Sequence, residues 1–268
     1  MTEAVWNGST KAATRPQFYV WMAGACLAIA VLGFAPTYAL PLATGKFFGP
    51  PLIHVHAAIL YTWMIYFFVQ SSLVARGQVL AHRTWGMLGI SIVTAMVFMT
   101  LTVSAIQIAQ ASLPGQPEGL AHNMRAFKWI SVGGMLFIAT VFTLAIVSLR
   151  KPEVHKRLIV LMTISMLGAP IARWFIFFLA PASDAAAHVN DPLPYMEVPP
   201  VFVALPPSLI GDLLLVVAMV YDWRTRGRPH QVYLIGGAAL LLLQLTSVPV
   251  SQSAPWQAAA AWLGSIAG

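Results

Sequence analysis

The sequence predicts an all-α integral membrane protein, a bundle of seven transmembrane helices. Three observations lead to this prediction. The 268 residues are 59% hydrophobic and only 9% charged, with a mean hydropathy of +0.76. Apolar runs long enough to cross a bilayer recur along the chain, and basic residues gather between them. A soluble domain has about 25% charged residues, so the composition excludes an ordinary soluble fold.

Seven apolar runs predict the membrane-spanning helices. Each has about 18–25 residues, close to the ~20 needed to cross the hydrocarbon core. Lipid offers no partner to a free backbone group, so every run must be helical. The runs are 17–40, 51–75, 84–109, 127–149, 157–180, 201–222 and 231–248. The first run is too long for a signal peptide and is interpreted as an anchor.

Basic residues predict the orientation. Eleven of them precede the first run or follow the second, fourth and sixth: Lys11, Arg15, Arg76, Arg83, Arg150, Lys151, Lys156, Arg157, Arg224, Arg226 and Arg228. The other side has only Lys46, Arg125 and Lys128. Because cytoplasmic loops are enriched in Lys and Arg, the N-terminus is expected in the cytoplasm and the C-terminus outside. These positions explain the net charge of +7 without a nucleic-acid partner.

Three segments complete the predicted organisation. A cytoplasmic tail of 1–16 precedes the transmembrane domain of 17–248. The proline-rich, acidic stretch 181–200 predicts an irregular outer loop over the mouth of the bundle. In the outer tail, 249–268, Trp256 and Trp262 suit a short helix lying in the interface, and a mobile tail is the alternative.

The second run contains the first candidate site. His54 and His56 lie near its start and Gln70 near its end, and a histidine in a lipid-spanning helix is a candidate functional residue. On a helix that turns about 100° per residue, His56, Trp63 and Gln70 share one face. His54 points away from that face if the helix has already begun there.

Four histidines on successive helices are candidate haem ligands. The predicted orientation places His56 and His122 toward the outside, and His82 and His155 toward the inside. Neutral imidazole is a common axial ligand of haem iron, and bundles hold cofactors between facing helices. Two such pairs would carry electrons across the membrane. A structural role at the interface stays open for each of these residues.

A metal site is an alternative at His54 and His56. If the Pro50–Pro51 entry keeps the chain extended through His56, the two rings fall on one side and bind copper or zinc together. No carboxylate or cysteine cluster elsewhere in the sequence adds ligands to this pair.

Arg173 and Asp212 are the other intramembrane candidates. Arg173 follows a Gly168–Pro170 break, which is expected to kink the fifth helix. Asp212 lies in the middle of the sixth run, where an unpaired charge costs several kcal/mol, so Arg173 is the expected partner by depth. Such a pair could serve a proton relay, a haem propionate or a quinone, or could be purely structural.

Two resemblances follow from these motifs. The segments HVHAAILYTWMIYFFVQSSLVARG, LAHRTWGMLG and HKRLIVLMTISMLGAPIAR resemble a broad set of uncharacterised bacterial multi-span membrane proteins, with HR-x-x-G and HKRL motifs in common. The layout of His56, His82, His122 and His155 resembles that of the dihaem transmembrane cytochromes b. That resemblance implies one haem between spans two and four and a second between spans three and five.

The resulting expectation is a multi-pass protein of the bacterial inner membrane that binds b-type haem and passes electrons, with quinone or another redox carrier as partner. One rival is a non-redox transporter or assembly factor that uses Arg173 and Asp212. Another is a copper or other metal site at His54 and His56. Whether the chain is an enzyme stays open, because no nucleotide-binding glycine loop, Ser/His/Asp order or zinc-protease helix occurs.

Overall fold

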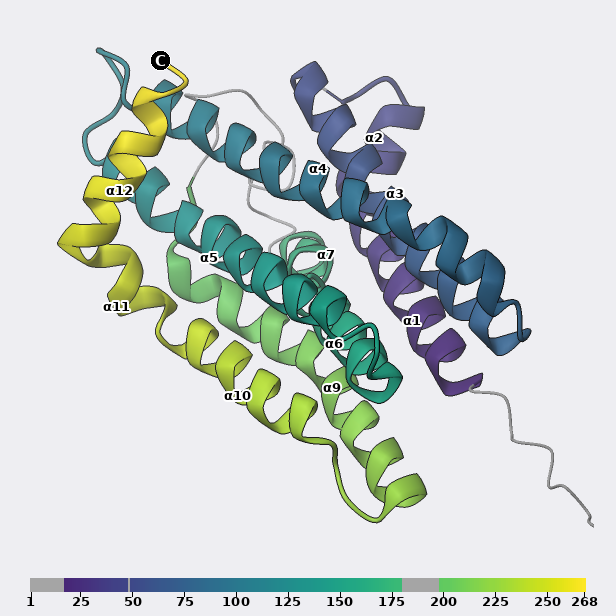
Figure 1. Cartoon of the computed structure of the whole chain (residues 1–268). Helices are drawn as coiled ribbons and strands as arrows, with labels where there is room; N and C mark the ends of the chain where they lie inside the picture. Colours follow the sequence, from purple (N-terminus) through teal and green to yellow (C-terminus); the bar gives the residue numbers. More distant parts are fainter. Residues whose placement is uncertain (1–16, 48, 180–197) are drawn as a thin grey trace, which may run out of the picture.

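The computed structural model describes residues 17–47, 49–179 and 198–268, and these residues form helices and connecting turns without any strand. Six helical stretches are long and apolar enough to cross a membrane (Figure 1). They bear out the predicted fold class in its coarse form, because the described residues are all-helical and include several helices suited to a multi-pass membrane protein. A seventh apolar helix has 15 residues, fewer than a full span needs. The count of seven spans and the orientation therefore stay predictions.

The helices follow one another with short connections. They are α1 (Gln17–Phe34), continued by the π-helical turn η1 (Ala35–Ala39) into α2 (Leu40–Ala43); α3 (Pro51–Ala75); α4 (Val79–Ala111); α5 (Leu120–Val147); α6 (Pro152–Ser165); α7 (Gly168–Trp174), followed by η2 (Phe175–Leu179); η3 (Val201–Ala204) leading into α9 (Leu205–Arg226); α10 (Gln231–Leu245); α11 (Ser247–Gln252); and α12 (Ala254–Ser265). The predicted tail 1–16 and most of the predicted loop 181–200 lie outside the described residues.

Local chemistry explains several of these boundaries. α3 and α6 each have a proline in the first turn, where its missing N–H breaks no helical hydrogen bond. Gly77 and Gly227 have φ values of 76° and 77°, which only glycine adopts freely, and they form the tight turns after α3 and α9. The helix break predicted near Gly168–Pro170 is present, because α6 ends at Ser165 and α7 begins at Gly168.

Three helices begin earlier than hydropathy predicts. α4 begins at Val79 rather than 84, α5 at Leu120 rather than 127, and α6 at Pro152 rather than 157. The extra first turns are polar and basic, and such side chains extend to the interface while their backbone stays helical. As a result His82, His122 and His155 all lie on helices rather than in loops.

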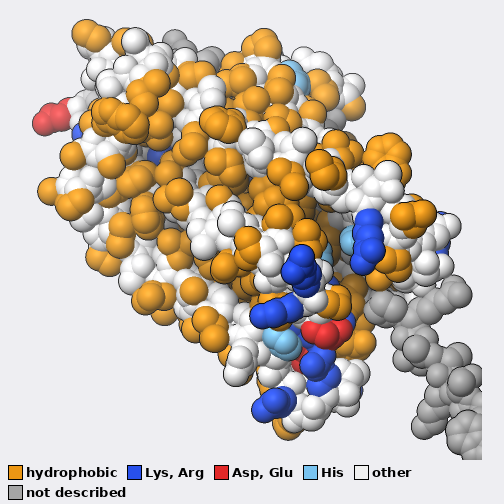
Figure 2. All heavy atoms as spheres, viewed as in Figure 1, with side chains coloured by type: hydrophobic (Ala, Val, Ile, Leu, Met, Phe, Trp, Pro, Cys, Tyr) orange, Lys and Arg blue, Asp and Glu red, His pale blue; other side chains and the backbone are white. Residues whose placement is uncertain are grey.

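Two ends of the bundle differ in charge. The turns that follow α3, α5 and α9 lie at one end, where Lys and Arg side chains gather (Figures 1 and 2). We call this the basic end, and the other the opposite end. α3 and α5 begin at the opposite end, and α1, α4 and α7 finish there. The segregation of charge that supports the predicted orientation is therefore a property of the folded chain.

The C-terminal helix covers part of the opposite end. α12 packs on α4 and α5. The Trp256 Nε1 donates a hydrogen bond of 2.8 Å to the carbonyl of Arg125, and its ring meets Trp129 edge to face at 5.0 Å. Trp262 is 67% exposed. The segment is thus a helix packed on the bundle, with Trp256 buried in the contact and Trp262 pointing outward. Its position in a membrane interface stays a prediction.

The contact of α1 with α7 is a sensitive packing point. A Cβ added to Gly33 would lie 2.5 Å from both the Cβ and the carbonyl oxygen of Pro170, and backbone cannot move aside as a side chain can. Gly33→Ala is expected to destabilise the protein by about 1–3 kcal/mol, measured by titrating detergent-solubilised protein with SDS. Gly134→Ala is the control, because a Cβ there meets nothing within 4 Å. Equal stability of the two variants would contradict the packing argument.

Cysteine labelling tests the predicted orientation. The only native cysteine, Cys26, is fully buried and gives no background. In intact cells, Arg228→Cys at the basic end should resist a membrane-impermeant maleimide until the membrane is permeabilised. Glu118→Cys, between α4 and α5, should react at once. If Arg228→Cys reacts at once and Glu118→Cys is protected, the predicted orientation is wrong and the basic end lies outside.

Candidate functional sites at the two ends of the bundle

His82 and His155 lie at the same end of the bundle, the basic end. Each lies in the first turn of its helix, α4 and α6, and their imidazoles interact electrostatically. His155 Nδ1 lies 2.9 Å from the carbonyl of Ala145 near the end of α5. A carbonyl only accepts, so Nδ1 carries the proton and Nε2 of the neutral ring keeps its lone pair. Metal-binding histidines are commonly oriented in this way.

Two buried polar atoms at this site, one on His82 and one on Gln70, have no hydrogen-bond partner among the described residues. His82 Nδ1 is buried and makes no hydrogen bond with the described residues, and the backbone carbonyl of Gln70 lies beside its ring. The side-chain oxygen Oε1 of Gln70 is also buried without a partner. Buried polar atoms nearly always have partners, so these orphaned atoms mark the basic end as a candidate site.

The face of α3 predicted to carry His56, Trp63 and Gln70 is buried at Trp63 and Gln70. Trp63 is 1% exposed and Gln70 is 6% exposed, and the Trp63 Nε1 donates a hydrogen bond of 3.2 Å to Thr163 on α6. His56 lies on the same face about 14 residues, or roughly 21 Å, before Gln70. The buried side of α3 therefore connects a polar group at the opposite end with the histidine pair at the basic end.

His56 meets two cations rather than a second histidine. The charges that act on it come from Lys128 on α5 and Arg173 on α7. His122 is exposed, and its Nε2 lies 2.7 Å from Oε1 of Gln252 on α11. In the described part of the chain, His82 and His155 thus lie at one end of the bundle, while His56 is surrounded by cationic charge and His122 is hydrogen-bonded to Gln252.

His54 has an environment of its own. Its Nδ1 lies 2.9 Å from the hydroxyl of Tyr38, and its ring contacts Phe47. α3 already begins at Pro51, so the extended geometry on which the His54–His56 metal hypothesis depends is absent. Among the described residues, no group of three or more His, Cys, Asp and Glu could hold a metal ion.

Arg173 and Asp212 do not pair with each other. No ion pair within the described ranges includes either residue. The Arg173 guanidinium lies over the ring of Phe34, 5.8 Å from its centroid. Asp212 faces the side-chain amide of Gln244 on α10.

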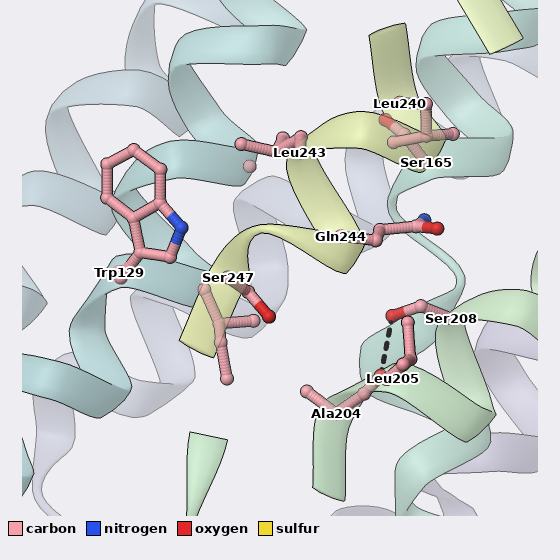
Figure 3. Close-up of a pocket in the computed structure, with 11 residues that line it drawn as sticks. Trp129, Ser165, Ala204, Leu205, Ser208, Leu240, Leu243, Gln244 and Ser247 are labelled. Carbon is pink, nitrogen blue, oxygen red and sulfur yellow. Dashed lines mark hydrogen bonds between the residues drawn. The ribbon is translucent and has the colours of Figure 1, made fainter. Parts of the chain in front are cut away.

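A small cavity of about 80 Å³ lies between α5, α9 and α10, and Gln244, the residue that Asp212 faces, is part of its lining (Figure 3). Ser165, Ser208, Gln244 and Ser247 supply its polar lining, and the indole of Trp129 forms part of its wall. The hydroxyl of Ser208 already donates to the carbonyl of Ala204 at 2.7 Å. The cavity is large enough for water but not for a cofactor.

The strongest buried ion pair was not predicted from the sequence. Arg157 on α6 is 1% exposed and Asp222 on α9 is fully buried. The Nε of Arg157 donates to Asp222 Oδ2 at 2.8 Å, its Nη2 donates to Oδ1, and its Nη1 donates to Glu153 at 2.8 Å. The available signal was that Glu153 and Asp222 are the only acidic residues in the predicted basic segments from the third run onward.

This pair fixes the helix that carries His155. Arg157 follows His155 by two residues, and its bidentate bond ties the start of α6 to the end of α9. Asp222 Oδ2 also accepts from the backbone N–H of His230 at 3.2 Å, which joins the start of α10 to the same point.

Comparison with family models, curated proteins and solved structures found no match for this chain.

The Arg157–Asp222 pair generates a stability prediction. Asp222→Asn removes the buried counter-charge of the Arg157 guanidinium and leaves it only the half-exposed carboxylate of Glu153, so a loss of about 3 kcal/mol is expected in SDS titration. Arg228→Gln, an exposed control at the same end, should change stability by less than about 0.5 kcal/mol. Replacing both partners with leucine should recover much of the loss, because no charge then stays buried. An Asp222→Asn variant as stable as the control would refute this account.

Proposed function

We propose that this protein is a membrane electron-transfer protein that binds one b-type haem at the basic end, with His82 and His155 as axial ligands. The observation that carries the proposal is that His82 and His155 lie in the first turns of α4 and α6 at the same end of the bundle, near enough for their charges to interact, with His155 Nδ1 hydrogen-bonded to the Ala145 carbonyl. The resemblance to dihaem cytochromes b suggested two haems. The partners of His56 and His122 support only the one at the basic end.

The number and kind of available ligands fit haem better than a metal held by protein alone. Haem iron takes four ligands from the porphyrin and needs only two from the chain. The site offers Nε2 of His155 and the unpartnered Nδ1 of His82, both imidazole nitrogens. A copper or zinc ion without a macrocycle needs three or four protein ligands, and the described residues contain no such cluster.

Each supporting residue has a defined task in this proposal. The Ala145 carbonyl orients the His155 ring, and the Arg157–Asp222 pair holds the helix that presents it. Gln70, buried beside His82, supplies an amide that can hydrogen-bond a bound group. Haem, when bound, supplies a one-electron iron couple. A membrane quinone is the proposed exchange partner, since it reaches an intramembrane site through the bilayer.

The two rivals have less support. The transporter or assembly-factor hypothesis depends on Arg173 and Asp212 acting together, and the structure gives these residues separate partners. The copper hypothesis depends on His54 and His56 facing one ion, and the helix begins before both.

An absorption spectrum tests the proposed function. Protein purified in detergent from cells supplied with haem precursor should show a b-type α-band in the reduced-minus-oxidised spectrum. His82→Ala and His155→Ala should each lose this band, because a single axial ligand rarely retains haem at full occupancy. His54→Ala and His122→Ala are matched controls and should keep it.

The outcomes separate the hypotheses. No α-band in the wild-type protein, despite haem supply, would overturn the proposal. A band that disappears only in His56→Ala would move the haem to the opposite end. A blank spectrum together with copper by elemental analysis would favour the metal site, and loss of function in Asp212→Asn with a blank spectrum would favour the transporter.

A further inference from the structure

Four polar side chains gather at the opposite end of the bundle, away from the proposed haem. His56 lies in the second turn of α3 and Lys128 in the third turn of α5, counted from helix starts at that end. Gln107 lies near the end of α4 and Arg173 near the end of α7. The Lys128 charge acts on His56, and the Arg173 charge acts on both His56 and Lys128. We call this group the Lys128 cluster.

The cluster is cationic, and no carboxylate among residues 17–47, 49–179 and 198–268 pairs with it. Lys128 is only 6% exposed, and its single hydrogen bond runs from Nζ to Oε1 of Gln107, a neutral acceptor. Arg173 contacts an aromatic ring and makes no hydrogen bond or ion pair within the described residues. His56 Nδ1 is buried and unpartnered in the same part of the chain.

This arrangement is costly unless something compensates it. An unpaired ion removed from water costs several kcal/mol, and placing two cations near each other adds repulsion. A lysine ammonium has three donors and a guanidinium has five, yet within the described residues Lys128 and Arg173 make only one hydrogen bond, to a neutral oxygen. The unused donors point to an acceptor that carries negative charge on more than one oxygen.

We propose that the Lys128 cluster binds an oxyanion, a carboxylate or phosphate group, between α3, α4, α5 and α7. The planar fork of Arg173 matches two oxygens of such a group, and the ammonium of Lys128 adds a charge-assisted bond. Gln107 holds the lysine at a fixed position. The group can belong to a small soluble anion or to the headgroup of an anionic phospholipid. This site does not depend on the haem proposal.

Thermal unfolding tests the site with soluble probes. Full-length protein in detergent is heated in malonate, in inorganic phosphate or in chloride, at equal ionic strength. A ligand that binds only the folded state stabilises it, and about 1 kcal/mol raises the midpoint by about 2–4 °C for a chain of this size. We expect such a rise with malonate or phosphate over chloride. Lys128→Met and Arg173→Gln should abolish it.

Matched variants control for charge and folding. Lys46→Met removes an exposed cation between α2 and α3 and should keep the full shift. Lys128→Arg retains the charge and should keep part of it. Elution of each variant as a monodisperse peak in size exclusion shows that it is folded.

Reconstitution distinguishes the two sources of the anion. In nanodiscs, phosphatidylglycerol should raise the unfolding midpoint over phosphatidylcholine, and Lys128→Met should lose that rise, if the ligand is a lipid phosphate. If the ligand is soluble, malonate or phosphate should stabilise the protein equally in both lipids.

Two results would overturn the proposal. One is an equal response of wild type, Lys128→Met and Arg173→Gln to every anion and lipid. The other concerns Asp184, Asp191 and Glu197, which lie outside the described residues. The triple variant Asp184→Asn, Asp191→Asn and Glu197→Gln removes these carboxylates. If it is less stable than wild type and added malonate or phosphate restores its stability, the occupant of the Lys128 cluster is one of the chain's own carboxylates.

Discussion

A bilayer offers no hydrogen-bond partner to a polar side chain, and this constraint sorts the buried polar groups of the protein. Some groups find complete partners inside the fold. Arg157 and Asp222 neutralise each other between α6 and α9, and Trp63 bonds Thr163 between α3 and α6. Others, at both ends of α3, have donors or acceptors that no described residue satisfies. The first set holds the helices together, and the second marks the places where a ligand would complete the structure.

The two kinds of group are mechanically linked. The ion pair between α6 and α9 sets the position of His155, and the inner face of α3 carries both Gln70 and His56. A substitution that changes the packing of α3 would therefore shift the positions of polar groups at both ends of the bundle. The proposed haem site and the proposed oxyanion site differ in chemistry, since one offers imidazole nitrogens and the other a lysine and an arginine. They are suited to different ligands on opposite sides of one membrane.

Composition and periodicity predicted the class of the fold well, because apolar length and basic loops reflect the bilayer directly. They also predicted the inner face of α3 and the break before Pro170. Helix starts were predicted too late, since hydropathy does not detect a polar first turn such as the one that carries His82. The partners of the buried charged side chains were harder to predict than the helix starts. Arg173 and Asp212 lie at compatible depths, yet depth does not tell which way a side chain points around a helix. Arg157 was counted only as an orientation signal, although its position on α6 turns it toward Asp222.

The contact between Gly33 and Pro170 has a consequence for how this fold can vary among relatives. The break between α6 and α7 leaves the second segment without a continuous helix to hold it, and the close approach of α1 supplies that support. A side chain at position 33 and the ring at position 170 compete for the same space. The two positions are therefore expected to change together in homologous sequences, as a linked pair far apart in the chain. Such co-variation would identify distant members of the group where the histidines themselves have been lost.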